Sequence, residues 1–253
     1  MENCKQILSA ILDAGEVMLC SGAEVSRVEN TIWHMAKAYG FTRVDVYTII
    51  FSIVVTVHDE EGNIETQTRR IEARDTNMRK VEKVNALSRR VCAKPLPLEE
   101  LKQEIEKIQN EKGYPGWLIF LIYGISSAAF TVFFGGGAGD AVASFVGGLI
   151  IRLVLIAGTR LRIQIIVLNM LCAAVAGLMA VPMVRLGLGQ SLDMILIGNI
   201  MLLIPGLAFT ISLRDMIRGD LISGLLGLCE AVIKALAIAG GLALVLWQFG
   251  GGL

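Results

Sequence analysis

The chain has 253 residues, of which 54% are hydrophobic, and its 23 basic and 23 acidic side chains give a formal net charge of zero. This balance lacks the excess of basic residues typical of nucleic-acid-binding proteins, and no run of Lys and Arg indicates DNA or RNA binding. The charges are unevenly distributed, because residues 1–114 contain 16 Lys/Arg and 18 Asp/Glu whereas residues 115–253 contain 7 and 5. We therefore expect a soluble domain at 1–114 and a membrane domain at 115–253.

Cysteine and glycine patterns exclude several kinds of site. The five cysteines are scattered, no CxxC motif occurs, and the chain has only two histidines, so we expect neither a metal site nor a disulfide framework. The glycine run at 135–137 has no strand before it and no Lys-Ser/Thr after it, which argues against a phosphate-binding loop. No cofactor is therefore expected. The first residues also lack the basic and apolar regions of a signal peptide.

The first domain begins with two predicted helices. Apolar residues recur at helical spacing over residues 5–20, and a second helix is predicted from 23 to 39. Gly40 lies where a glycine ends a helix. Residues 44–57 are rich in β-branched side chains and predict strand structure, and residues 64–71 predict a returning strand after a turn.

Two further helices complete this domain. Residues 76–93 return to helical spacing, and Pro95 and Pro97 end that helix. Residues 98–111 then predict a charged helix. Together these elements predict a compact α+β domain.

The second domain consists of five apolar segments joined by short connections. Each segment reaches or approaches the roughly 20 residues that a membrane helix needs. We therefore expect an α-helical bundle of about five transmembrane helices. The segments are 115–134, 141–158, 163–184, 192–213 and 221–248.

Arginines in the connections predict the orientation. The second and fourth connections carry two arginines each, the third carries one and the first carries none. Because basic residues favour the cytoplasmic side, we expect the N-terminal domain in the cytoplasm and the C-terminus, residues 250–253, outside the plasma membrane.

The stretch 204–234 holds most of the candidate site. Pro205 and Gly206 interrupt an apolar segment, which indicates either a simple kink or a discontinuous helix whose freed amide groups face a solute. Arg214 is suited to bind a carboxylate group, and Asp215 to bind an ammonium group or a proton, although both could instead be interface charges. The predicted substrate-binding residues are Pro205, Gly206, Arg214, Asp215 and Asn199, with interhelical hydrogen bonding as the alternative for Asn199.

Ionisable residues in or near the apolar segments are candidates for coupling transport to protons or ions. Glu230 and Lys234 are four positions apart, so they share a helix face and form either a structural pair or part of a site. Glu230 is the best candidate for a proton carrier. The predicted coupling residues are Glu230, Asp220, Lys234 and Asp140.

The soluble domain offers no clear catalytic arrangement. Residues 21–29, with sequence SGAEVSRVE, contain a serine and charged residues but no accompanying Ser/His/Asp set or paired carboxylates. A helix junction with salt bridging is the better interpretation. We therefore do not expect an enzyme.

Several motifs in the same order resemble one protein family. Residues 15–32, with sequence GEVMLCSGAEVSRVENTI, resemble the opening motif of the threonine/serine exporter family. Residues 83–89, the turn at 134–136 with Asp140, and the stretch from Pro205 to Ala231 resemble later motifs. The resemblance implies a cytoplasmic domain, membrane spans, and export of small amino acids or carboxylic acids.

The resemblance covers only the first half of full-length members of that family. It is closest to the split bacterial form, in which a smaller membrane protein supplies the second half. We therefore expect a subunit of a secondary transporter, driven by protons, that exports threonine and serine or a dicarboxylate such as succinate. The expected partners are the lipid membrane, the small-molecule substrate and this second subunit, and a homo-oligomer is also compatible. The alternative is a membrane-anchored sensor or assembly scaffold whose soluble domain is the active part.

Overall fold

The computed structural model describes residues 2–72 and 75–249, and the C-terminal residues 250–253, expected outside the cell, lie beyond the described part. The chain forms two compact units. We call Met1–Lys112 together with Leu207–Leu228 the N-terminal unit, and Gly113–Gly206 together with Cys229–Leu253 the bundle unit. Each is described separately.

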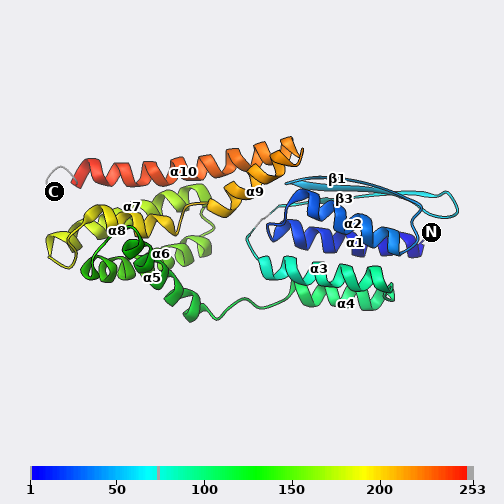
Figure 1. The fold of residues 1–253 in the computed structure, drawn as a ribbon, viewed down its shortest axis with the longest axis horizontal. Coiled ribbons are helices and arrows are strands. Elements are labelled where there is room, and N and C mark those ends of the chain that lie inside the picture. Colours follow the sequence, from blue (N-terminus) through cyan, green and yellow to red (C-terminus); the bar gives the residue numbers. More distant parts are fainter. Residues whose placement is uncertain (1, 73–74, 250–253) are drawn as a thin grey trace. The chain divides into compact units, whose positions relative to one another are not determined.

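The N-terminal unit contains an antiparallel three-stranded sheet whose order is β1-β2-β3 (Figure 1). Its first elements are α1 (Glu2–Cys20), α2 (Val25–Ala38), β1 (Arg43–Ile49), β2 (Ser52–His58) and β3 (Ile64–Arg70). Two further helices follow, α3 (Met78–Ala93) and α4 (Leu98–Gln109). The helices predicted in residues 1–114 are present together with a small sheet, which agrees with the predicted mixture of helices and strands in this part of the chain. Gly40 has a φ of +88°, as a glycine that ends a helix requires.

One face of the sheet and the four helices enclose the core. Along β2, Ile53, Val55 and Val57 are buried, and they alternate with partly exposed residues, as expected for a strand with one covered face. These side chains belong to the same apolar cluster as Leu8, Ile11 and other residues of the helices.

The predicted strand region 44–57 is two strands rather than one. Ile49 pairs with Ser52, so Ile50 and Phe51 form the turn of a hairpin. Neither residue is a turn former, and the sequence therefore gave no signal of a reversal. Ile50 is buried, which indicates that core packing favours the turn at this point.

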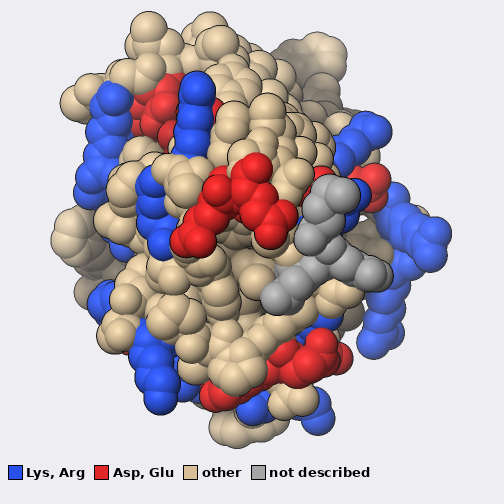
Figure 2. All heavy atoms as spheres, turned by 90° about the vertical axis from the view of Figure 1, so that its right-hand side faces the viewer, with Lys and Arg blue, Asp and Glu red and all other residues tan. Residues whose placement is uncertain are grey.

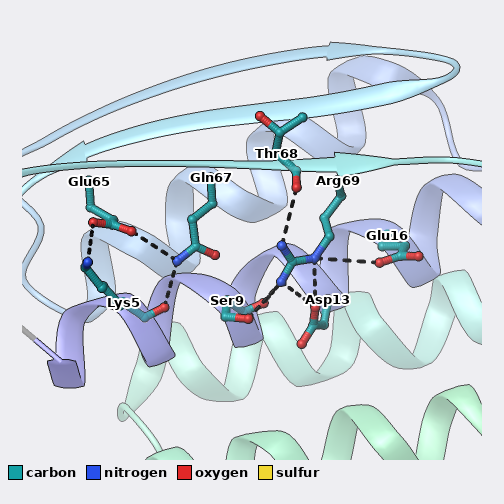
Figure 3. Close-up of polar contacts among 8 residues, drawn as sticks. All are labelled: Lys5, Ser9, Asp13, Glu16, Glu65, Gln67, Thr68 and Arg69. Atoms are coloured by element: carbon teal, nitrogen blue, oxygen red, sulfur yellow. Dashed lines mark hydrogen bonds and ion pairs between the residues drawn. The ribbon is translucent and has the colours of Figure 1, made fainter.

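Polar contacts attach β3 to α1, as Figure 3 shows. The Arg69 guanidinium donates to Asp13 Oδ1 at 3.0 and 3.1 Å and to Ser9 Oγ at 2.7 Å. Gln67 Nε2 donates to the Lys5 carbonyl oxygen at 3.0 Å. Because β3 carries few apolar side chains, these contacts replace the apolar packing that holds β2.

One face of the molecule carries charges of both signs. On the face in Figure 2, Lys/Arg and Asp/Glu side chains are interspersed, with no broad area of one sign. This face therefore lacks the continuous basic surface that binding to nucleic acid would use.

Six helices, four of them long and apolar, follow in the rest of the described chain. They are α5 (Gly116–Phe133), α6 (Ala138–Arg160), α7 (Ile165–Arg185), α8 (Leu192–Met201), α9 (Gly206–Ile217) and α10 (Leu221–Phe249). Within the described residues, four helices are long and apolar enough to span a membrane, and α8 with α9 would make a fifth span. The expected number of about five transmembrane helices therefore agrees with the count that includes α8 with α9 as one span.

Helices of the bundle unit approach one another closely through small residues. A Cβ atom on Gly148 of α6 would lie 2.5 Å from the Tyr123 carbonyl oxygen of α5. A Cβ atom on Gly147 would lie equally close to Asn199 of α8. At Gly148 a side chain would press on the backbone of α5 and push the helices apart, whereas at Gly147 it would displace the Asn199 side chain.

Candidate functional site

The fourth apolar segment is broken. The axes of α8 and α9 differ in direction by 57°, and residues 202–205 between them are not helical. Pro205 has no N–H group and cannot continue the hydrogen-bond ladder of α8. The Ile200 carbonyl accepts from the Leu203 N–H at 2.8 Å and closes α8. Residues 202–205 therefore interrupt the helical segment, and Gly206 begins α9.

The end of α9 binds the junction between α1 and α2 within the N-terminal unit. Arg214 Nη1 lies 2.5 Å from Glu24 Oε1, and Arg218 Nη1 lies 2.5 Å from Glu24 Oε2. Arg218 also donates to Ser26 Oγ at 3.0 Å, and Arg27 lies 3.8 Å from the same carboxylate. We call Glu24, Arg214 and Arg218 the Glu24 cluster.

Local geometry explains why both arginines reach one carboxylate. Arg214 and Arg218 are four positions apart, so their side chains leave the same face of the helix end. Gly219 has a φ of +101°, which allows the chain to turn there into α10. The Asp220 N–H then donates to the Asp215 carbonyl at 3.0 Å, and this hydrogen bond closes the turn.

Two carboxyl groups beside this cluster have raised pKa values. Burial raises the pKa of Glu29, the hydrogen bond from the Thr48 N–H at 2.8 Å lowers it, and the charge of Asp220 raises it further. Burial also raises the pKa of Asp220, and the nearby Arg218 opposes this rise. The predicted coupling residue Asp220 therefore has an environment that favours proton binding, and Glu29 shares it.

Asn199 belongs to a buried polar cluster in the bundle unit. Ser127 Oγ donates to Asn199 Oδ1 at 2.7 Å, and Thr131 Oγ1 donates to Ser144 Oγ at 2.6 Å. All four side chains are buried. They link α5, α6 and α8, which is the interhelical hydrogen bonding that the sequence left open for Asn199.

Asp140 accepts hydrogen bonds from three backbone N–H groups. Its Oδ2 accepts from Gly137 at 2.9 Å, and its Oδ1 accepts from Gln190 at 2.6 Å and Ser191 at 2.9 Å. The carboxylate caps the start of α6 and holds the connection between α7 and α8. These bonds account for its burial without a bound ion.

Glu230 and Lys234 are paired on α10. Lys234 Nζ lies 2.7 Å from Glu230 Oε1, and the lysine side chain is more buried than the glutamate side chain. The predicted i,i+4 pairing is therefore present. Among residues 2–72 and 75–249, no hydrogen bond or ion pair links Glu230 or Lys234 to Asn199 or Asp140.

The largest difference from the sequence interpretation concerns Glu24. Residues 21–29 were interpreted as a helix junction with salt bridging, and the structure confirms that interpretation. The partner arginines of Glu24, however, are about 190 positions away in the chain. Sequence alone contains no signal for such a pairing, except that both segments belong to the motifs noted above.

Comparisons with known proteins agree on one family. The family model described as "Putative threonine/serine exporter" matches residues 9–248. A "Probable succinate transporter subunit YjjP" of Klebsiella aerogenes is 26% identical over 92% of this chain and 90% of that protein. A protein with the same description from Escherichia coli K12 is 26% identical over 99% of this chain and 98% of that protein.

A longer relative is similar over part of its length. A "Probable threonine/serine exporter" of Mycobacterium tuberculosis is 23% identical over 96% of this chain but only 46% of that protein. No solved structure matches the chain. Because the family match spans nearly the whole sequence and the apolar helices fit a multi-pass membrane protein, the chain belongs to the threonine/serine exporter family.

Proposed function

We propose that the chain is one subunit of a secondary transporter that exports small amino acids or carboxylic acids across the plasma membrane. The observation that carries the proposal is how much of each relative's length this chain matches. The chain covers at least 90% of relatives named as transporter subunits, but 46% of a relative named as an exporter. A second, smaller membrane subunit of the same family would supply the remaining half. The sensor or scaffold alternative is not favoured, because all these relatives are named as transporters.

The proposed orientation places residues 1–112 in the cytoplasm and the C-terminus outside. Arg160 ends α6 and Arg162 follows it, while Arg214 lies in the last turn of α9 and Arg218 follows that helix. These arginines favour the cytoplasmic side for both connections. The ion pairs of Glu24 with Arg214 and Arg218 support the same side for the soluble domain.

In this proposal the substrate meets the chain at the break before α9, and Arg214 in the last turn of α9 is a further proposed substrate residue. The first turn of a helix has N–H groups without intrahelical partners, and these favour an anionic group. Arg214 already holds a carboxylate, that of Glu24, which supports its suitability for a substrate carboxylate. Pro205, Gly206 and Asp215 would border this site.

Export would be coupled to protons through carboxyl groups near α10. Asp220 is supported by its raised pKa and by the neighbouring Glu29. Glu230 is proposed because it lies within an apolar helix, where it pairs with Lys234. Substrate binding by Asn199 and ion coupling by Asp140 stay predictions. The hydrogen bonds of both residues also serve the structure.

An export assay in cells tests the proposal. Cells that lack their own exporters would express this chain, the smaller subunit or both, and succinate, threonine and serine would be measured in the medium. We expect export only when both polypeptides are present. Equal export by this chain alone would contradict the two-subunit proposal, and no export of any of the three solutes by the pair would contradict the transport function.

A further inference from the structure

The N-terminal unit contains a pocket of about 580 Å³ between α2 and α3. Each helix lines it with residues at positions i, i+3, i+4 and i+7, which lie on a single helix face. On α2 the series begins at Arg27 and ends at His34, and on α3 it begins at Asn85 and ends at Cys92. Polar stripes from two helices therefore lie beside one pocket, and both come from motifs noted in the sequence.

The pocket is cationic. Arg27, Arg89 and Arg218 contribute guanidinium groups, and Asn30 and Asn85 contribute amide donors. The lining residues in the described part of the chain include no aspartate or glutamate. This lining therefore suits an anionic ligand, because paired guanidinium groups bind carboxylate and phosphate oxygens well.

The arginines differ in how far they are already neutralised. Arg27 and Arg218 both have Glu24 as an ion-pair partner. Arg89 is exposed, and within residues 2–72 and 75–249 no ion pair or side-chain hydrogen bond of Arg89 is found. Arg27 and Arg218 thus share the Glu24 carboxylate, and Asp220 also lies near Arg218. Arg89 is therefore the pocket arginine whose charge is left for an anion.

We infer that this pocket binds a small dicarboxylate. Through Arg218, binding of this ligand would also affect the turn between α9 and α10. Two separated carboxylate groups can be held by Arg89 on one side and by Arg27 and Arg218 on the other. The pocket has no carboxylate to pair with an ammonium group, so a dicarboxylate should bind better than threonine or serine. The anion-binding pocket is inferred from its lining alone. The choice of a dicarboxylate as the anion rests on the proposed function.

The coupling follows from competition for Arg218. This arginine lines the pocket and also binds Glu24 and Ser26. A ligand carboxylate that takes Arg218 weakens its bond to Glu24, and hence weakens the attachment of the α9 end to the junction of α1 and α2. By thermodynamic reciprocity, weakening the Glu24 bond must strengthen ligand binding.

Isothermal titration calorimetry on the purified full-length chain tests the inference. Succinate would be compared with neutral succinamide, with threonine and with inorganic phosphate, at low and moderate salt. We expect saturable binding of succinate that is about tenfold weaker in Arg89→Gln and in Arg218→Gln. The matched control is Arg90→Gln, whose arginine pairs with Glu104 on α4 and should leave binding within about twofold. Glu24→Gln should tighten binding.

The outcomes are separable from those of the export assay, because calorimetry on this chain requires no transport. Absence of saturable succinate binding, or binding that Arg89→Gln leaves unchanged, would overturn the pocket assignment. Equal or tighter binding of phosphate or threonine would overturn the dicarboxylate assignment. Unchanged affinity in Glu24→Gln would overturn the coupling through Arg218.

Discussion

The Glu24 cluster offers the most direct energetic prediction. The Glu24 side chain is only 9% exposed, whereas the side chains of Arg214 and Arg218 are 50% and 40% exposed. Breaking a buried ion pair costs about 3–5 kcal/mol, and an exposed pair contributes about 0.2–1 kcal/mol. Because the carboxylate is buried and the guanidinium groups are partly hydrated, the free-energy cost of breaking the Glu24 ion pairs should lie between these limits.

We expect the double variant Arg214→Gln/Arg218→Gln to lose about 2 kcal/mol of stability, since it leaves the buried Glu24 carboxylate with only Arg27 nearby. Glu24→Gln should lose about 1 kcal/mol, because the two guanidinium groups can turn toward water. For a chain of this size, about 1 kcal/mol corresponds to a fall of about 2–4 °C in Tm.

Thermal unfolding of the purified full-length protein, followed by tryptophan fluorescence, measures these losses. In the background of Glu24→Gln, the two arginine replacements should cost about 1 kcal/mol rather than about 2 kcal/mol, so the coupling should be about 1 kcal/mol. Arg70→Gln, at an exposed position of β3, is the control. Additive effects, within about 0.5 kcal/mol, would refute the cluster as a structural link.

Four further predictions concern transport, pH and topology. Arg214→Lys keeps the charge but loses the guanidinium fork, so export by the two-subunit transporter should fall about ten- to a hundredfold with unchanged abundance; wild-type export rates would argue against Arg214 in the site. Glu230→Gln should abolish the dependence of export on a pH gradient, and an unchanged dependence would make Glu230 structural. The raised pKa of Glu29 stabilises the fold below its ordinary pKa, and this contribution disappears as pH rises through the folded-state value; the Tm of Glu29→Gln should therefore fall less than that of the wild type with rising pH, whereas the exposed control Glu82→Gln should follow the wild type. A cysteine added after Leu253, in a background without the five native cysteines, should react with an impermeant thiol reagent in intact cells, and labelling only after lysis would reverse the proposed orientation.

Local patterns predicted most of the elements. Helical spacing of apolar residues located α1 to α4, and segment length located the apolar helices. Pro205 located the break between α8 and α9, because proline removes a backbone donor wherever it lies. These signals are local, and each depends on the chemistry of a few neighbouring residues.

Features that depend on tertiary contacts were not predictable in the same way. The hairpin at Ile50 and Phe51 has no turn residue, and burial of Ile50 in the core accompanies it. The pairing of Glu24 with Arg218 joins positions 194 apart, and no periodicity within one sequence indicates it. The polar residues of α2 from Arg27 to His34 could have been noticed from their helical spacing. That spacing does not reveal that α3 lies beside them.

Efflux from proteoliposomes tests the central claim most directly, namely that this chain is half of a carboxylate or amino-acid exporter. Vesicles loaded with radiolabelled succinate, threonine or serine would contain this chain, the smaller subunit, or both, under an imposed pH gradient. We predict saturable efflux of at least one solute only with both polypeptides, and slower efflux when the gradient is dissipated. Saturable efflux from vesicles that contain this chain alone, or none from vesicles that contain both, would contradict the account.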